Sequence, residues 1–264
     1  MHEGFKTIDT YMKKTLLKLA LAAMALFLNC CVMAQTAESD EFMQKYKELD
    51  DLLVSKRKQW INNSRTGEWC NNCYTDIFSI LDAVELMPQC ELGIDMPDES
   101  KDDYLTGLGA DIWVKNNRGK QSYSYLSYIK LKNVSAASCW QWFLLYNLRF
   151  YEPTYLSLYC SQEYVFTDED FQEILKGIRI VPDSIIGVGL HEKEYQELKK
   201  LNIMPVRVEV DDSKSKAVIS LYSWNDNEGL TEKHFHLMIN KDGIAWMGKI
   251  DSKTIFAYFS GIID

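Results

Sequence analysis

The stretch FHLMINKDGIAWMGKID, residues 235–251, decides the architecture expected for the end of the chain. Apolar side chains recur there at every second position, at Phe235, Leu237 and Ile239, and this spacing points them to one face of a β-strand. Lys241-Asp242-Gly243 supplies turn residues, and IAWMGKI then continues as a second extended segment. The stretch therefore predicts an antiparallel hairpin.

Two more alternating segments, PVRVEV and KAVISLYSW, precede this hairpin. Four successive strands with short connections favour an antiparallel meander, since parallel strands need long crossover connections. The last sixty residues are therefore expected to form one antiparallel sheet. The alternating apolar residues of the two segments are Val206, Val208, Val210, Ala217, Ile219 and Leu221.

Helical patterns precede the sheet. The clearest is FTDEDFQEILKGI, in which Thr167 or Asp168 supplies the cap and Gly177 the exit. Pro153 pushes the residue before it out of helical geometry, so the aromatic segment upstream should end before it. The predicted helices span residues 40–62, 74–87, 134–150, 167–177 and 191–202.

The middle of the chain carries different signals. The acidic, proline-bearing stretch PQCELGIDMPDESKDD, residues 88–103, is the best linker candidate. Beyond it, ADIWVKN and SYSYLSYIKLK flank residues 117–119, which predicts a strand, a turn and a second strand. We expect an α+β fold with N-terminal helices, then helices packed on a curved antiparallel C-terminal sheet.

The final hairpin resembles that of the NTF2-like (nuclear transport factor 2, cystatin-like α+β) superfamily. Members often end in a strand, an Asp-Gly or similar turn, and then Trp followed by Lys-Ile and an acidic residue. The resemblance covers about residues 134–264, and it implies that Trp246 and Ile250 form a buried pair. It departs where Met247-Gly248 separate Trp246 from Lys249. The resemblance implies two regions. Residues 35–132 are expected to form a helical region with a short hairpin, and residues 133–264 are expected to form an NTF2-like α+β domain.

The N-terminus predicts export. Lys13-Lys14 begins a basic segment, residues 19–28 are nearly all apolar, and Val32-Met33-Ala34 offers small residues for cleavage. We expect a signal peptide over residues 1–34 with a true start at Met12, and a periplasmic or extracellular mature chain without a transmembrane segment. A lipid anchor at Cys30 or Cys31 is the alternative, although Asn29 or Cys30 stands where a lipidation signal has Gly, Ala or Ser.

Charge excludes one class of partner. Residues 1–34 carry four lysines against Glu3 and Asp9, so their removal takes the net charge from −9 to −11. Such a chain repels phosphate backbones, and nucleic-acid binding is not expected. Hydrophobic residues make up 47% of the chain, enough for a sizeable core.

The cysteines leave alternatives open. GEWCNNCY places Cys70 and Cys73 in redox spacing before a predicted helix, whose N-terminus would lower a thiol pKa. No strand pattern delivers that motif, so a structural disulfide is favoured over an oxidoreductase. Cys70–Cys73 is the expected pair, and Cys73–Cys90 across the second helix is the alternative. One such pair without further ligands is a weak zinc signal. The mature chain has five cysteines, namely Cys70, Cys73, Cys90, Cys139 and Cys160. At least one is left over, and Cys139 in the aromatic helix is the expected buried thiol.

Other candidate sites are weaker. His234 and His236 share one face of a strand and could bind a metal with Glu209, although that face is more simply the solvent side. Trp140, Phe143, Tyr222 and Trp224 are candidates to line an apolar ligand pocket, although such aromatics are more often core. No Asp or His matches a catalytic position of the resembled family, and no cofactor is indicated. The favoured function is non-catalytic binding of a small ligand, a peptide or an envelope protein.

Overall fold

The structure is a computed structural model, and it describes residues 39–52, 55, 73–95, 111–115, 119–122, 124–148, 163–182, 184 and 187–259. The chain divides into two compact units, Met1–Glu41 and Phe42–Asp264. Of the first unit, only residues 39–41 are described, and they are helical. The predicted signal peptide, its start at Met12, its cleavage site and the lipid-anchor cysteines lie outside the described residues.

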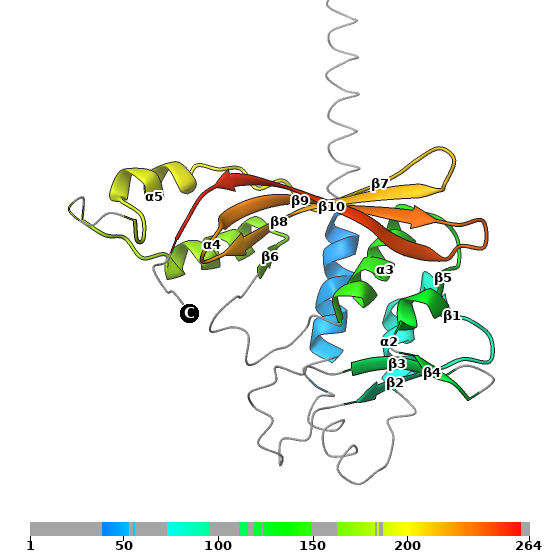
Figure 1. The fold of residues 1–264 in the computed structure, drawn as a ribbon. Helices are drawn as coiled ribbons and strands as arrows, with labels where there is room; N and C mark the ends of the chain where they lie inside the picture. The colour runs from blue at the N-terminus through cyan, green and yellow to red at the C-terminus, as the bar shows by residue number, and fades with distance from the viewer. Residues whose placement is uncertain are drawn as a thin grey trace, which may run out of the picture. The chain divides into compact units, whose positions relative to one another are not determined.

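The first half of the second unit combines helices with short strands. Residues 42–52 are helical, as predicted for the start of 40–62, and the predicted helix of 134–150 is confirmed as α3. β1 pairs with β5 in one small sheet, and β2, β3 and β4 form another (Figure 1). The elements are α2 (Cys73–Ile80), β1 (Val84–Leu86), β2 (Glu91–Asp95), β3 (Asp111–Lys115), β4 (Gln121–Ser122), the 3₁₀ turn η2 (Tyr125–Tyr128), β5 (Ile129–Leu131) and α3 (Ala136–Leu148).

The predicted helix of residues 74–87 is too long. α2 ends at Ile80, and the side chain of Gln141 on α3 then holds the turn that follows. Its Oε1 accepts from the Ala83 N–H at 2.6 Å, and its Nε2 donates to Asp82 at 2.9 Å. Val84–Leu86 leave the helix because they pair with Ile129–Leu131, a partner 45 residues away that no local pattern reveals.

Two further predictions in this half need correction. The linker candidate of residues 88–103 contains β2, which pairs with β3 along its whole length. The predicted strand over SYSYLSYIKLK is broken into β4, η2 and β5, and only β4 pairs with β3. The hydroxyl of Tyr125 in η2 donates to the Leu145 carbonyl. This hydrogen bond joins the 3₁₀ turn to α3 at the point where the extended conformation is interrupted.

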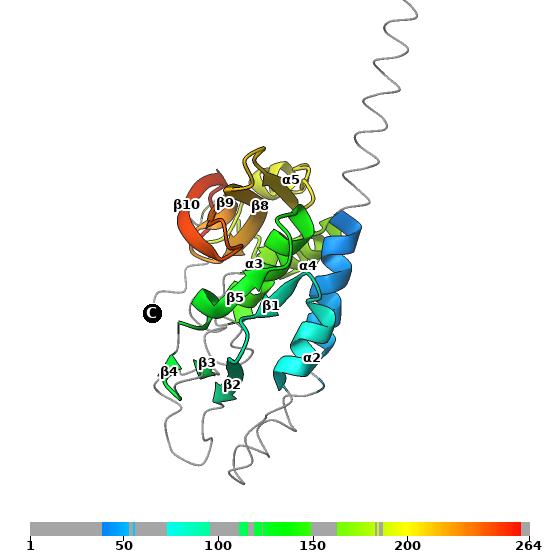
Figure 2. The same cartoon turned by 90° about the vertical axis from the view of Figure 1, so that its right-hand side faces the viewer.

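The predicted C-terminal meander is confirmed. β7, β8, β9 and β10 follow one another as antiparallel neighbours, and β6 extends the sheet by pairing with the other end of β8. Figure 2 shows the curl of β8, β9 and β10. With the helices, the chain is α+β. The strands are β6 (Glu163–Val165), β7 (Arg207–Val210), β8 (Lys216–Asn225), β9 (Gly229–Ile239) and β10 (Ala245–Phe256).

Two helices lie between β6 and β7. α4 (Asp168–Gly177) begins as predicted, since Thr167 accepts from the Asp170 N–H while the Asp170 carboxylate accepts from the Thr167 N–H. α5 (Glu192–Leu198) is shorter than the predicted 191–202. Gly177 is the last residue of α4, and the chain leaves through Ile178 in an extended conformation.

The sheet separates two hydrophobic clusters. One face of β8 and β9, with Ile219 and Phe235, belongs to the first cluster, which also contains the aromatic side of α3. The opposite face near the far end of β8, with Trp224 and Leu230, belongs to the second, which α4 and α5 supply with Phe171 and Leu198. Residues before and after position 133 share the first cluster, so the two predicted regions have one core.

The predicted burial of Trp246 and Ile250 is wrong. The side chain of each is 47% exposed. Trp246 lies opposite Met238, on the face turned away from the first cluster, while Ile250 lies opposite Phe235 on the core side but at the outer edge of the sheet. The extra residue Gly248, between Met247 and Lys249, shifts the alternation of side chains along β10. Trp246 and Ile250 therefore lie on opposite faces, whereas the resemblance places them together.

Candidate functional site

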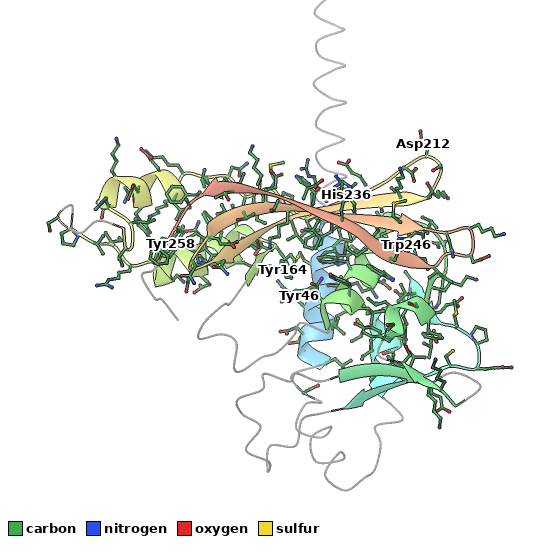
Figure 3. All side chains as sticks on the ribbon, in the orientation of Figure 1. Tyr46, Tyr164, Asp212, His236, Trp246 and Tyr258 are labelled. Atoms are coloured by element: carbon green, nitrogen blue, oxygen red, sulfur yellow. The ribbon has the colours of Figure 1, made fainter. Side chains whose placement is uncertain are left out.

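The side of the C-terminal sheet that faces away from the first cluster is polar where α4 and α5 do not cover it. Strand register assigns its members, since directly opposed residues in antiparallel strands share a face. We call this surface the polar sheet face, and Figure 3 labels two of its members, His236 and Trp246. It comprises Arg207, Glu209, Lys216, Val218, Ser220, Glu232, His234, His236, Met238, Trp246, Lys249, Asp251 and Lys253.

His234 on β9 lies between a hydroxyl and a carboxylate. The Ser220 Oγ is 2.8 Å from its Nδ1, and the Glu232 Oε1 is 3.8 Å from its Nε2. Ser220 is directly opposite His234 in the ladder, whereas Glu232 is two positions along the same strand. The types and order of these groups resemble a hydrolytic triad, so the backbone around Ser220 matters.

The geometry around Ser220 does not suit acyl transfer. A serine nucleophile needs free N–H donors to hold the oxyanion of the intermediate. Ser220 lies in the middle of β8, paired with Arg207 on one side and His234 on the other. Its backbone groups are therefore used by the sheet, and the three side chains make a structural cross-strand network.

His236 belongs to a second network on the same face. Its Nε2 is 2.9 Å from the Asp251 Oδ2, and the Lys249 ammonium donates to the same oxygen at 2.8 Å. The hydrogen bond from Lys249, followed by smaller effects that include His236, holds the pKa of Asp251 below its ordinary value. The network ties β10 to β9 by side chains on an open surface.

The proposed metal ligands are not brought together. Glu209 pairs with Val218, and Val218 in turn pairs with His236, so β8 lies between the carboxylate and the histidines. Two strand spacings, about 10 Å, separate the backbone at Glu209 from the backbone at His236. Over the part of the chain that the structure describes, no group of three His, Cys, Asp or Glu side chains could hold a metal.

Comparisons with family models, curated proteins and solved structures found no match. What this surface can do therefore follows from its own geometry.

The four pocket candidates lie in two different places. Trp140 and Phe143 are 0% exposed, stacked on one another in the first cluster with centroids 5.4 Å apart. Trp224 is buried in the second cluster, and Tyr222 packs against it. Burial of Tyr222, together with the nearby Glu232, raises its pKa. Trp140, Phe143 and Trp224 are core residues, and Tyr222 is partly buried against the second cluster.

The two cysteines whose side chains are described are unpaired. Cys139 is free and fully buried, as predicted for the leftover thiol, and burial raises its pKa to about 12. Cys90 is also free. Cys73 begins α2, but its side chain, Cys70, Cys160 and the segment before Trp69 lie outside the described residues, so the disulfide and the redox pair remain predictions.

Sequence reasoning placed the histidines but missed their partners. Ser220, Lys249 and Asp251 lie on the solvent-facing side of their strands. Only the pairing register between strands brings them next to His234 and His236. Alternation alone could have assigned the face. It could not have aligned β8 or β10 with β9.

Proposed function

We propose that this chain is an exported, non-catalytic protein of NTF2-like kind that binds another polypeptide through the polar sheet face. The observation that carries the proposal is Trp246, which is 47% exposed directly opposite Met238. Tryptophan and methionine are enriched in protein interfaces, and a half-exposed indole is a strong anchor because its burial removes a large apolar area from water.

The charges around Trp246 favour a polypeptide of mixed charge. Cations at Arg207, Lys249 and Lys253 share the face with carboxylates at Glu209 and Asp251. Such interspersed charges form a polar rim, which contributes to orientation more than to affinity. A small apolar ligand is less well supported, since the aromatic rings that were candidates to surround one are packed in the two hydrophobic clusters.

The antiparallel C-terminal sheet with α3 against one face supports the NTF2-like part of the proposal. The exposed Trp246 and Ile250 are departures from the resembled pattern. The export part is supported by the sequence signals of residues 12–34. Among the described residues, no helix is long and apolar enough to cross a membrane.

Export is tested with residues 12–40 fused to a phosphatase that is active only outside the bacterial cytoplasm. We expect activity, and a product that begins at Gln35, because the apolar run and the small residues at Val32-Met33-Ala34 suit signal cleavage. Leu21→Arg should abolish the activity by breaking the apolar run. An inactive fusion, or equal activity in the variant, would contradict export.

Binding is tested by photo-crosslinking in cells that produce the full chain. A photoreactive phenylalanine analogue at position 246 should give a specific adduct with a second polypeptide. The same analogue at Ile180, which is 46% exposed outside the polar sheet face, is the matched control. Equal adducts from both positions, or none from position 246, would argue against the proposed interface.

A further inference from the structure

Among the described strands, β10 lies at the edge of its sheet and pairs with β9 alone. It also contacts η2 and β5, and Ile244, just before its start, forms a bridge with Lys130. From Gly248 to Thr254 every residue is exposed, and no described strand lies beside this segment. Such an edge presents unpaired N–H and C=O groups that can template another strand.

The hairpin shows which backbone groups face outward. The Ile239 N–H donates to Ser215 beyond β8, whereas the Asn240 N–H donates to Ile244 across the turn. Alternation along β9 therefore turns the backbone groups of odd-numbered residues toward β8. Ile250, Ser252 and Thr254 lie opposite the odd-numbered residues Phe235, Lys233 and Thr231, so their own N–H and C=O groups point away from β9.

We propose that this edge pairs with β10 of a second copy of the chain, antiparallel and about a two-fold axis at Ser252. Ser252 then lies opposite Ser252 of the second copy, and Ile250 lies opposite Thr254 of that copy. All of these positions carry outward-facing backbone groups, as hydrogen-bonded antiparallel pairs require. The two sheets become one continuous sheet.

Charge selects this register. With the axis at Ser252, Asp251 lies opposite Lys253 of the second copy on the polar sheet face, twice by symmetry. A shift of the axis to Asp251 would oppose Asp251 to its own copy and Lys249 to Lys253, and a shift to Lys253 would oppose two lysines. Like charges directly opposite destabilise a sheet, while opposite charges stabilise it.

The two irregularities of β10, at Gly248 and between Thr254 and Phe256, remove the remaining competitors, which are axes at Ile250 and Thr254. An axis at Ile250 would also pair Lys249 with Asp251, but it would bring Gly248 into the ladder opposite Ser252. Gly248 is the extra residue between Met247 and Lys249, which have consecutive partners on β9. A bulged residue disrupts pairing. Residues 249–254 form the regular run, and Ser252 as the axis keeps the pairing of residues 250–254 within it.

A cysteine at the axis tests the register in the full chain. Ser252→Cys places two thiols opposite one another with Cα atoms about 5.5 Å apart, within the range for a disulfide. Thr254→Cys is the matched control, because its two copies lie about 13 Å apart along the strands. Under mild oxidation we expect Ser252→Cys to give a dimer linked through position 252 of both copies, mapped by mass spectrometry, and no corresponding link from position 254.

A charge swap tests the pairing without cysteines. Asp251→Lys and Lys253→Asp should each weaken the dimer about tenfold in sedimentation equilibrium, and the double swap should restore it because the opposite charges are re-formed. Ser252→Pro removes an outward N–H and should also weaken it without loss of the fold by circular dichroism.

A monomer at all concentrations, equal linking from positions 252 and 254, or a double swap no better than the single changes would overturn the pairing about Ser252. An adduct at position 246 with a polypeptide other than this chain would stand after any of these outcomes, so the two proposals fail separately.

Discussion

At the scale of single residues, two neighbouring tryptophans of α3 show how differently the same side chain can be buried. Trp140 is 0% exposed, and its Nε1–H donates to the Phe42 carbonyl at 2.8 Å, a bond between residues 98 positions apart. Trp142 is 1% exposed and stacks on Tyr146, and its Nε1–H has no hydrogen-bond partner among the residues that the structure describes. An unpaired buried donor costs free energy that a paired one does not.

Trp140→Phe and Trp142→Phe are therefore a matched pair. Each removes a similar volume, but the first also loses a hydrogen bond while the second removes an unpaired donor. We expect Trp140→Phe to lower the free energy of unfolding by about 2 kcal/mol more than Trp142→Phe, in urea titrations of the full chain. Equal costs would mean that packing volume alone decides both.

The residue scale is also where prediction from sequence has its clearest limits. Alternation correctly assigned Phe235 and Leu237 to the core, because period two follows from strand geometry. The burial of Trp246 was inferred from resemblance, and the bulge at Gly248 and the position of β10 at the edge undid it. Ser220 and Asp251 could not be foreseen as histidine partners, since cross-strand register is a property of the assembled sheet.

At the scale of elements, turns depend on glycines that the local fold requires. Gly229, the first residue of β9, has a φ of +85°, and a Cβ there would overlap the Phe256 carbonyl oxygen. Gly177 at the end of α4 has ordinary φ, and a Cβ would meet nothing within 4 Å. The two positions look alike in the sequence but differ in what surrounds them.

Gly229→Ala and Gly177→Ala separate these cases. We expect the first to destabilise the chain by about 2 kcal/mol or more, because strain and backbone overlap add. The second should be neutral or slightly stabilising, since alanine is the better helix former. Thermal unfolding of both variants measures the difference. If Gly229→Ala costs no more stability than Gly177→Ala, the turn at Gly229 can relax around the added methyl group.

Elements with local signals were predictable, and those defined by distant partners were not. α4 has its cap and its capping carboxylate within four residues, so its start was correct. β1 exists because β5 pairs with it, and α2 ends where Gln141 binds the turn. The continuation of a helix and the start of a short strand differ by contacts that lie tens of residues away.

At the scale of the whole molecule, β8 connects the two hydrophobic clusters. One of its faces, which includes Leu221, belongs to the first cluster, and Trp224 on the other face near its far end belongs to the second. It pairs with β9 on one side and with β6 and β7 on the other. Loss of β8 would expose both clusters at once. Residues 42–264 are therefore expected to unfold as one cooperative unit.

This unit should lose stability at alkaline pH. Burial raises the pKa of the Cys139 thiol from 9.0 to about 12, so the unfolded chain loses this proton at lower pH than the folded one. The contribution of the Cys139 thiol to the free energy of unfolding is constant below pH 9 and falls as the pH rises toward 12. When the pH rises from 8 to 10.5, we expect the free energy of unfolding of Cys139→Ala to fall by about 1–2 kcal/mol less than that of the parent chain.

The measurement is urea unfolding at both pH values. Cys139→Ala lowers stability at each pH by leaving a cavity, so the change with pH is the informative quantity. Cys90→Ala, at the other cysteine that is free among the described side chains, is the substitution control. Tyr164, whose pKa burial also raises to about 12, keeps some dependence in every variant. Parallel pH profiles for all three proteins would contradict the assignment to Cys139.

The contact between β5 and the β9–β10 hairpin sets the order in which the chain can fold. The Leu131 N–H donates to the Gly243 carbonyl, and Lys130 bridges Ile244, so residues more than 100 positions apart must meet. Synthesis delivers the N-terminal side first. The buried face of α3 must wait, uncovered, until β8 and β9 emerge, and contacts so distant in sequence make folding slow. During that interval the aromatic helix is the natural target for a holding chaperone.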